Sequence, residues 1–118
     1  MKQAIVHHRD QTAPLDCPFG CVQRIVTGGE GGVANVHVVK VARGATHVHT
    51  GYDEVYYVLS GTGAVTLDRE THALQPGSVV VIPAGTEHNV VNTSDSEPLR
   101  LYTIYSPPEH QDGTINRT

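Results

Sequence analysis

Residues 77–92 read GSVVVIPAGTEHNVVN, a β-branched run followed by a proline–glycine turn and a histidine. We expect a strand over 78–82, because valine and isoleucine pack well in a sheet, and a second strand over 88–92. Pro83 and the flanking glycines set the turn between the two strands. The stretch therefore predicts a pair of strands joined by a turn that delivers His88.

The same pattern recurs along the rest of the chain. Alternating or continuous β-branched segments return roughly every ten residues with turn signals between them, and no stretch sustains an apolar repeat of 3.6 residues. The expected strands cover 22–27, 34–42, 54–60, 63–67, 78–82, 88–92 and 99–105. About the first twenty residues and the tail after Pro108 are expected to be irregular. The predicted fold class is all-β.

Length and composition limit the kinds of protein this chain can be. It has 118 residues and a mass of 12.7 kDa, which fits one domain over residues 1–118. The formal net charge is -4 and basic residues do not cluster, which argues against nucleic acid and anionic membranes as partners. No apolar run approaches the roughly 20 residues of a membrane-spanning helix, and the N-terminus lacks a signal-peptide stretch. We expect a soluble, cytoplasmic protein with no nucleic-acid or membrane partner.

The two cysteines, Cys17 and Cys21, flank a Pro-Phe-Gly segment. A redox pair and an accessory metal clip are both conceivable, but the spacing matches neither C-x-x-C nor a complete zinc set. We therefore expect ordinary thiols in a loop, as in a protein from a reducing compartment.

The strand expected over 54–60 is apolar on both faces. Side chains alternate across a strand, so Glu54, Tyr56 and Val58 share one face, and Val55, Tyr57 and Leu59 share the other. A sandwich of this size normally shows water one polar face, and residues 79–82 repeat the anomaly. The N-terminal segment, a second copy of the chain or both are expected to cover the outer faces. We predict a homodimer on this basis.

Eight histidines are many for this length, and several are arranged rather than scattered. His47 and His49 project from the same face of an extended chain, with Cα atoms about 6.6 to 6.8 Å apart, so both imidazoles can converge on one ion. After a short turn, Glu54 can aim back at the same point, and His88 supplies a fourth ligand from the second segment. The sequence predicts a mixed nitrogen and oxygen metal site.

These two segments resemble the signature motifs of the cupins. The core of the first motif, H-x-H-x4-E-x6-G, is met by His47, His49, Glu54 and Gly61. The second, G-x5-P-x-G-x2-H-x3-N, is met by Gly77, Pro83, Gly85, His88 and Asn92. The first motif's leading glycine would fall at Val41, and Gly44 lies nearer instead. The resemblance covers about 34–105 and implies a double-stranded β-helix, or jelly-roll barrel. It also implies one divalent transition metal ion (Fe, Mn, Ni, Co or Zn) held by His47, His49, Glu54 and His88.

Such a ligand set leaves two positions of an octahedral ion open, which favours catalysis. The leading hypothesis is a metal-dependent enzyme of dioxygenase, isomerase or lyase type, acting on a small polar metabolite that chelates through adjacent oxygens. Glu54 or a bound hydroxide would accept a proton, and Tyr56, on the same face as Glu54, either donates a hydrogen bond to the substrate or only lines the wall. Two alternatives stay open: a non-catalytic module that binds or senses a sugar or metabolite, and a barrel without metal.

Three further side chains are considered without a settled role. His37 has the opposite parity to Lys40, so it points into the barrel if Lys40 faces water. There it either supports the metal ligands or is a hydrogen-bonded core histidine, and the second interpretation is favoured. Tyr102 and Tyr105 in the last strand cannot be assigned to a face.

Overall fold

The computed structural model describes residues 4–17, 20–27, 34–42, 46–107 and 114–116. Within these ranges the chain forms one short 3-10 helix and eleven strands. They are η1 (Arg9–Gln11), β1 (Leu15–Cys17), β2 (Gly20–Val26), β3 (Asn35–Val41), β4 (His47–His49), β5 (Asp53–Ser60), β6 (Gly63–Leu67), β7 (Glu70–Leu74), β8 (Val79–Ile82), β9 (His88–Asn92), β10 (Leu99–Ser106) and β11 (Thr114–Asn116). None of the described helical residues belongs to a helix long and apolar enough to cross a bilayer.

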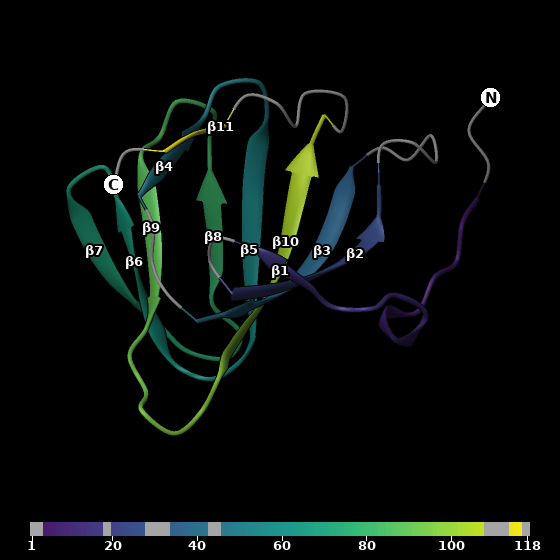
Figure 1. The fold of residues 1–118 in the computed structure, drawn as a ribbon. Coiled ribbons are helices and arrows are strands. Elements are labelled where there is room, and N and C mark those ends of the chain that lie inside the picture. Colours follow the sequence, from purple (N-terminus) through teal and green to yellow (C-terminus); the bar gives the residue numbers. More distant parts are fainter. Residues whose placement is uncertain (1–3, 18–19, 28–33, 43–45, 108–113, 117–118) are drawn as a thin grey trace.

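The strands form two sheets that face each other (Figure 1). One sheet has the order β1-β2-β3-β10-β5-β8, and the other has the order β11-β4-β9-β6-β7. All pairings are antiparallel, and the chain passes repeatedly from one sheet to the other. This is a jelly-roll barrel, or double-stranded β-helix, so the predicted all-β fold class is confirmed.

All seven expected strands are present, with ends within two residues of the prediction. Four strands were not expected: β1, β4, β7 and β11. Three of them have only three residues, too few for a periodicity to show. The fourth, β7, is an edge strand whose first four residues are exposed, so its sequence lacks apolar alternation. Within the described residues the ends are less irregular than expected, because η1, β1 and β11 lie there, whereas residues 108–113 of the tail lie outside those residues.

The two cysteines belong to a hairpin and not to a loop, which corrects the expectation. In the β1–β2 pair, Cys17 lies opposite Gly20 and Asp16 lies opposite Cys21. Cys21 is a free thiol whose sulfur lies 3.9 Å from a carboxylate oxygen of Asp16.

The interior of the six-stranded sheet changes from polar to apolar along the strands. Cross-strand neighbours point to the same face, so the inward residues form rows across the sheet. Two rows contain polar residues: Asn35, Tyr105 and Glu54 in one, and Arg24, His37, Thr103 and Tyr56 in the next. The following rows are apolar and almost fully buried: Val22, Val39, Leu101 and Val58, then Val41 and Leu99. The apolar core thus fills one end of the barrel, and the polar rows occupy the other.

The N-terminal segment covers part of the outer face of this sheet. The Gln23 side-chain amide donates to the carbonyls of Arg9 and Thr12, at 3.0 Å each. Residues 7–9 share a cavity wall with the outward-facing Ile25, Val36, Tyr102 and Ile104. Tyr102 therefore belongs to the outer face, whereas Tyr105 belongs to the inner one.

The outer face of β5 and β8 remains apolar and exposed. The expected parity of β5 is confirmed, because Tyr56 and Val58 are buried whereas Tyr57 is 43% exposed. Val79 and Val81 on the neighbouring strand are 60% and 63% exposed. The N-terminal segment is thus one of the covers expected from the sequence, and the homodimer stays a prediction.

We expect the full chain in solution to have about twice the 12.7 kDa monomer mass by light scattering. The double variant Val79→Lys, Val81→Lys should shift it to the monomer, because it places two charges on the exposed apolar face. Val91→Lys is the control, since Val91 is 37% exposed on the opposite sheet. A wild-type chain that stays monomeric at every concentration would contradict the prediction.

Candidate metal site

The four residues expected as metal ligands come from three strands of the barrel. His47 and His49 are the ends of β4, Glu54 is the second residue of β5, and His88 begins β9. His47 lies directly opposite His88 in the β4–β9 pair, which fixes these two side chains on one face. All four side chains are buried, with exposures of 5%, 6%, 1% and 1% in chain order.

Two backbone contacts hold the turn before His88 against the other ligand strands. The Gly85 amide donates to the His49 carbonyl at 2.7 Å, and the Ala84 amide donates to the Asp53 carboxylate at 2.8 Å. Gly85 has a φ of 90°, in the left-handed region that glycine adopts without strain. The proline–glycine turn therefore ties β4, β5 and β9 together at the point where the ligands meet.

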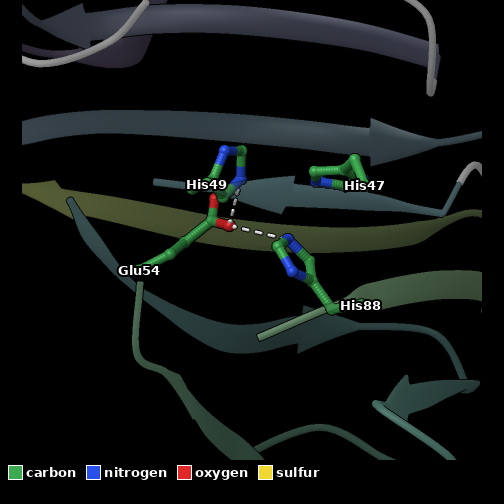
Figure 2. Close-up of side chains that lie close together, drawn as sticks. All are labelled: His47, His49, Glu54 and His88. Carbon is green, nitrogen blue, oxygen red and sulfur yellow. Dashed lines mark hydrogen bonds and ion pairs between the residues drawn. The ribbon is translucent and has the colours of Figure 1, made fainter. Parts of the chain in front are cut away.

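The side chains converge on one position, as Figure 2 shows. One ligand atom from each of the four residues lies within 4.8 Å of all the others. A single Glu54 oxygen is 3.1 Å from Nε2 of His49 and 3.3 Å from Nε2 of His88. Ligand atoms at about 2.0 to 2.2 Å from a common ion would themselves be about 3 to 4 Å apart. The cluster therefore fits a metal site, as the spacing in the sequence predicts.

The surroundings of His88 are the strongest indication that the cluster fits a metal ion. Nδ1 of His88 donates to the Thr86 carbonyl at 2.9 Å. In a neutral ring the proton is then on Nδ1, and Nε2 has a free lone pair. That Nε2 is buried, has no hydrogen-bond partner, and faces a carboxylate oxygen at 3.3 Å. Two electron-rich atoms this close repel unless a positive charge lies between them. A cation bound at this position would satisfy both atoms.

His49 is oriented by a tyrosine that the sequence analysis does not single out. The Tyr52 hydroxyl lies 2.6 Å from Nδ1 of His49, and the two rings stack with centroids 4.5 Å apart. This contact turns Nε2 of His49 toward Glu54. The sequence signal that could have marked Tyr52 is a large aromatic residue in an otherwise polar turn, and the structure shows it to be only 5% exposed.

The electrostatics keep Glu54 ionised. Burial alone raises its pKa, but the hydrogen bond with His49 and the neighbouring His88 imidazole outweigh burial and bring the pKa below its ordinary value. Burial, with the nearby charge of Glu54, raises the pKa of Tyr56 and of Tyr105 well above the usual range. The site thus presents one carboxylate and two protonated phenols.

A cavity of about 50 Å³ opens beside the cluster. Its lining combines His47, His49, Glu54, Tyr56, Thr103 and Tyr105 with Val39, Val41, Val90 and Leu101. This places Tyr56 next to Glu54, as expected, and adds Tyr105 and Thr103, which the sequence analysis left out of the site. Drug-sized ligands occupy pockets of roughly 300 to 1,000 Å³, so this cavity suits a much smaller molecule.

His37 lies inside the barrel, as its parity predicts, and is 7% exposed. Its ring packs edge-on against Tyr105 with centroids 5.2 Å apart. The favoured interpretation, a hydrogen-bonded core histidine, is wrong for Nε2, which is buried and lacks a hydrogen-bond partner among the described residues. Burial first, and then the charge of Arg24, lower its pKa from 6.5 to about 4, although Glu54 acts in the opposite direction. The ring is therefore neutral at pH 7.

A small jelly-roll barrel with three histidines and one glutamate gathered in its interior defines the class of this protein. Residues 34–105 match the family described as "Cupin domain". The chain belongs to the cupin family.

Comparison with individual proteins supports this assignment. The chain is 38% identical over 77 residues to the protein YrkC of Bacillus subtilis, covering 60% of this chain and 41% of the relative. It spans about half the length of the curated relatives it matches. A crystal structure of a protein from Planctomyces limnophilus is 25% identical, with a TM-score of 0.82 over 97% of this chain and 96% of the other. Ectoine synthase from P. lautus is 18% identical and shares the fold, with a TM-score of 0.78 over 98% of this chain and 91% of that one.

Tyr52→Phe is expected to weaken the binding of added Co(II) about tenfold, because it removes the hydrogen bond that orients His49. Tyr57→Phe is the matched control, since Tyr57 lies on the outer face of β5. Titration followed by the absorption spectrum of Co(II) measures the affinity. Equal affinities in both variants would show that the contact does not orient the ligand.

The depressed pKa of His37 predicts a pH-dependent contribution to stability. The unfolded chain takes up a proton on His37 near pH 6.5, whereas the folded chain does so only near pH 4, so this contribution is complete above pH 6.5 and is lost as the pH falls toward 4. In metal-free protein, the melting temperature of the His37→Gln variant should therefore fall less than that of wild type between pH 6.5 and pH 4. Arg24, Glu54 and Tyr105, which face His37, are common to both proteins. Parallel melting curves would refute the assigned pKa.

Proposed function

We propose that this cupin binds one divalent transition metal ion through His47, His49, Glu54 and His88 and acts on a small polar metabolite. The observation that carries the proposal is the buried, unpartnered Nε2 of His88 facing the Glu54 carboxylate. Three imidazoles and one carboxylate suit Fe, Mn, Ni, Co or Zn, and the ligand set does not select among them.

Bound there, the ion would supply Lewis-acid polarisation of a substrate that chelates through adjacent oxygens. Glu54 is ionised and lies at the cavity, so it is placed to accept a proton from a substrate carbon adjacent to a carbonyl or carboxylate group. Tyr56 and Tyr105 stay protonated and line the same cavity, where each can donate a hydrogen bond to a substrate oxygen. Valine and leucine side chains close the inner end against water.

This arrangement supports an enzyme of lyase, isomerase or dioxygenase type. Removal of a proton next to a carbonyl or carboxylate is the step that these reaction types have in common at such a site. The fold match to ectoine synthase supports an enzymatic role for a barrel of these dimensions, but at 18% identity it carries no substrate over. The proposal includes the cytoplasm as the compartment in which the protein acts.

The first arm of the test measures metal in untagged protein. Wild type should retain about one equivalent after incubation with Fe(II), Mn(II), Ni(II), Co(II) or Zn(II) and desalting, and His88→Ala should retain far less. His72→Ala is the control, because the His72 side chain on β7 is 53% exposed and outside the cluster. Full metal retention by His88→Ala would remove His88 from the ligand set.

The second arm measures turnover. Metal-loaded wild type is incubated with a panel of 2-hydroxy acids, 2-keto acids and diketones, and substrate loss and oxygen uptake are followed. Glu54→Gln should lower any activity found by at least about a hundredfold, since general-base catalysis contributes roughly 10² to 10⁴. Glu70→Gln, an exposed carboxylate on β7, should leave it unchanged. Metal-dependent binding of a panel member without its consumption would instead identify a binding or sensing module.

A further inference from the structure

The second polar row of the barrel interior is not needed to hold a metal. It runs across four neighbouring strands, from Arg24 on β2 through His37 on β3 and Thr103 on β10 to Tyr56 on β5. None of these residues is a member of the metal-type cluster. Apolar side chains could fill this row of the interior, as they do in the next two rows.

Two atoms of this row are buried without a partner. Nε2 of His37 and Oγ1 of Thr103 have no hydrogen bond, and the residues are 7% and 3% exposed. Thr103 acts to lower the pKa of the nearby Tyr105 hydroxyl, against the larger effect of burial, but Thr103 Oγ1 has no hydrogen-bond partner among the described residues. Buried polar groups are almost always paired, so these atoms point to a partner that arrives as a ligand. Of this row, Thr103 and Tyr56 line the cavity beside the metal-type cluster.

The charge of the row is positive. Arg24 is exposed and lies opposite His37 in the β2–β3 pair, on the inward-facing side of the sheet. It forms no ion pair with any residue that the structure describes, whereas Lys40, on β3, is exposed with the outward parity. His37 is neutral at pH 7 and can donate a hydrogen bond. One cation and two neutral donors form a site for a carboxylate.

We propose that this cupin binds a small ligand that has a carboxylate at each end. Arg24, His37 and Thr103 would bind one carboxylate, and oxygens at the other end of the ligand would bind at the metal site. The proposal rests on the proposed metal binding, and it names the ligand class as small dicarboxylic hydroxy or keto acids. The charges balance: a divalent ion, the Glu54 carboxylate and the Arg24 guanidinium sum to +2, which a dianion neutralises. The small cavity, which the metal-type cluster shares with Thr103, limits the ligand to a few carbon atoms.

The test compares two acids that differ only at the far end. Malate and 2-hydroxybutyrate have the same chain length and the same 2-hydroxy carboxylate, but 2-hydroxybutyrate has a methyl group in place of the second carboxylate. Each is titrated by calorimetry into the full-length, Ni(II)-loaded protein at pH 7.5, after metal content has been measured in the same samples. Wild type should bind malate at least about tenfold more tightly, the ratio expected for one charge-assisted hydrogen bond.

Arg24→Gln should reduce this preference to about threefold or less without changing the affinity for 2-hydroxybutyrate. Lys40→Gln removes the same charge from the outward face of β3 and should leave the preference unchanged. His37→Phe keeps a ring against Tyr105, loses both nitrogens, and should also lower the preference. If His37→Phe fails to fold, the exposed Arg24 still decides the question.

If metal-loaded wild type binds the two acids equally, or binds neither, the dicarboxylate proposal is wrong, but the proposed metal binding is not affected. An Arg24→Gln variant with the wild-type preference would overturn it as well. Protein that retains no metal would instead overturn the proposed function on which it rests.

Discussion

A carboxylate buried inside a β-barrel is the constraint on which this structure depends. Glu54 is 1% exposed, and an ionised carboxylate removed from water is very unfavourable unless positive charge or hydrogen-bond donors surround it. A neutral His88 ring, whose Nδ1 donates to the Thr86 carbonyl, has no proton on Nε2 to donate to Glu54. It also cannot move away, because the position of its backbone is fixed by pairing with His47. The barrel therefore brings an imidazole nitrogen and a carboxylate oxygen together in a way that a bound cation would stabilise.

The residues of the two motifs that do not face the cluster have a mechanical role. Gly85 adopts a positive φ and sends its amide to the His49 carbonyl, so the turn before His88 is tied to the strand of the first two histidines. Gly61 also has a positive φ, and a Cβ there would lie 2.3 Å from the Pro98 carbonyl oxygen. Larger residues at Gly61 would push apart the segment after β5 and the segment before β10. The glycines thus set the distances at which the strands that carry the ligands can meet.

How much of this could be predicted from sequence depends on how local each feature is. His47, His49, Glu54 and His88 could be identified because strand parity and motif spacing alone bring them together. Arg24 and Thr103 could not, because they lie in one row with His37 only through the pairing of β2, β3 and β10, and β10 is far from the other two strands in sequence. The same limit left Tyr105 without a face, and β4 is too short to show any period.

The barrel interior serves here as both core and site, and the two demands conflict. Val58, Leu99 and Leu101, which are at most 2% exposed, supply apolar burial at one end. The polar end leaves unpartnered buried atoms on His37, His88 and Thr103, each of which costs about 1 to 3 kcal/mol when nothing binds it. Apolar side chains of similar size at these three positions would remove that cost, but they would also remove three polar groups that can bind a ligand. A barrel that retains these polar atoms is less stable than its backbone allows, and this is expected where selection acts on binding rather than on stability alone.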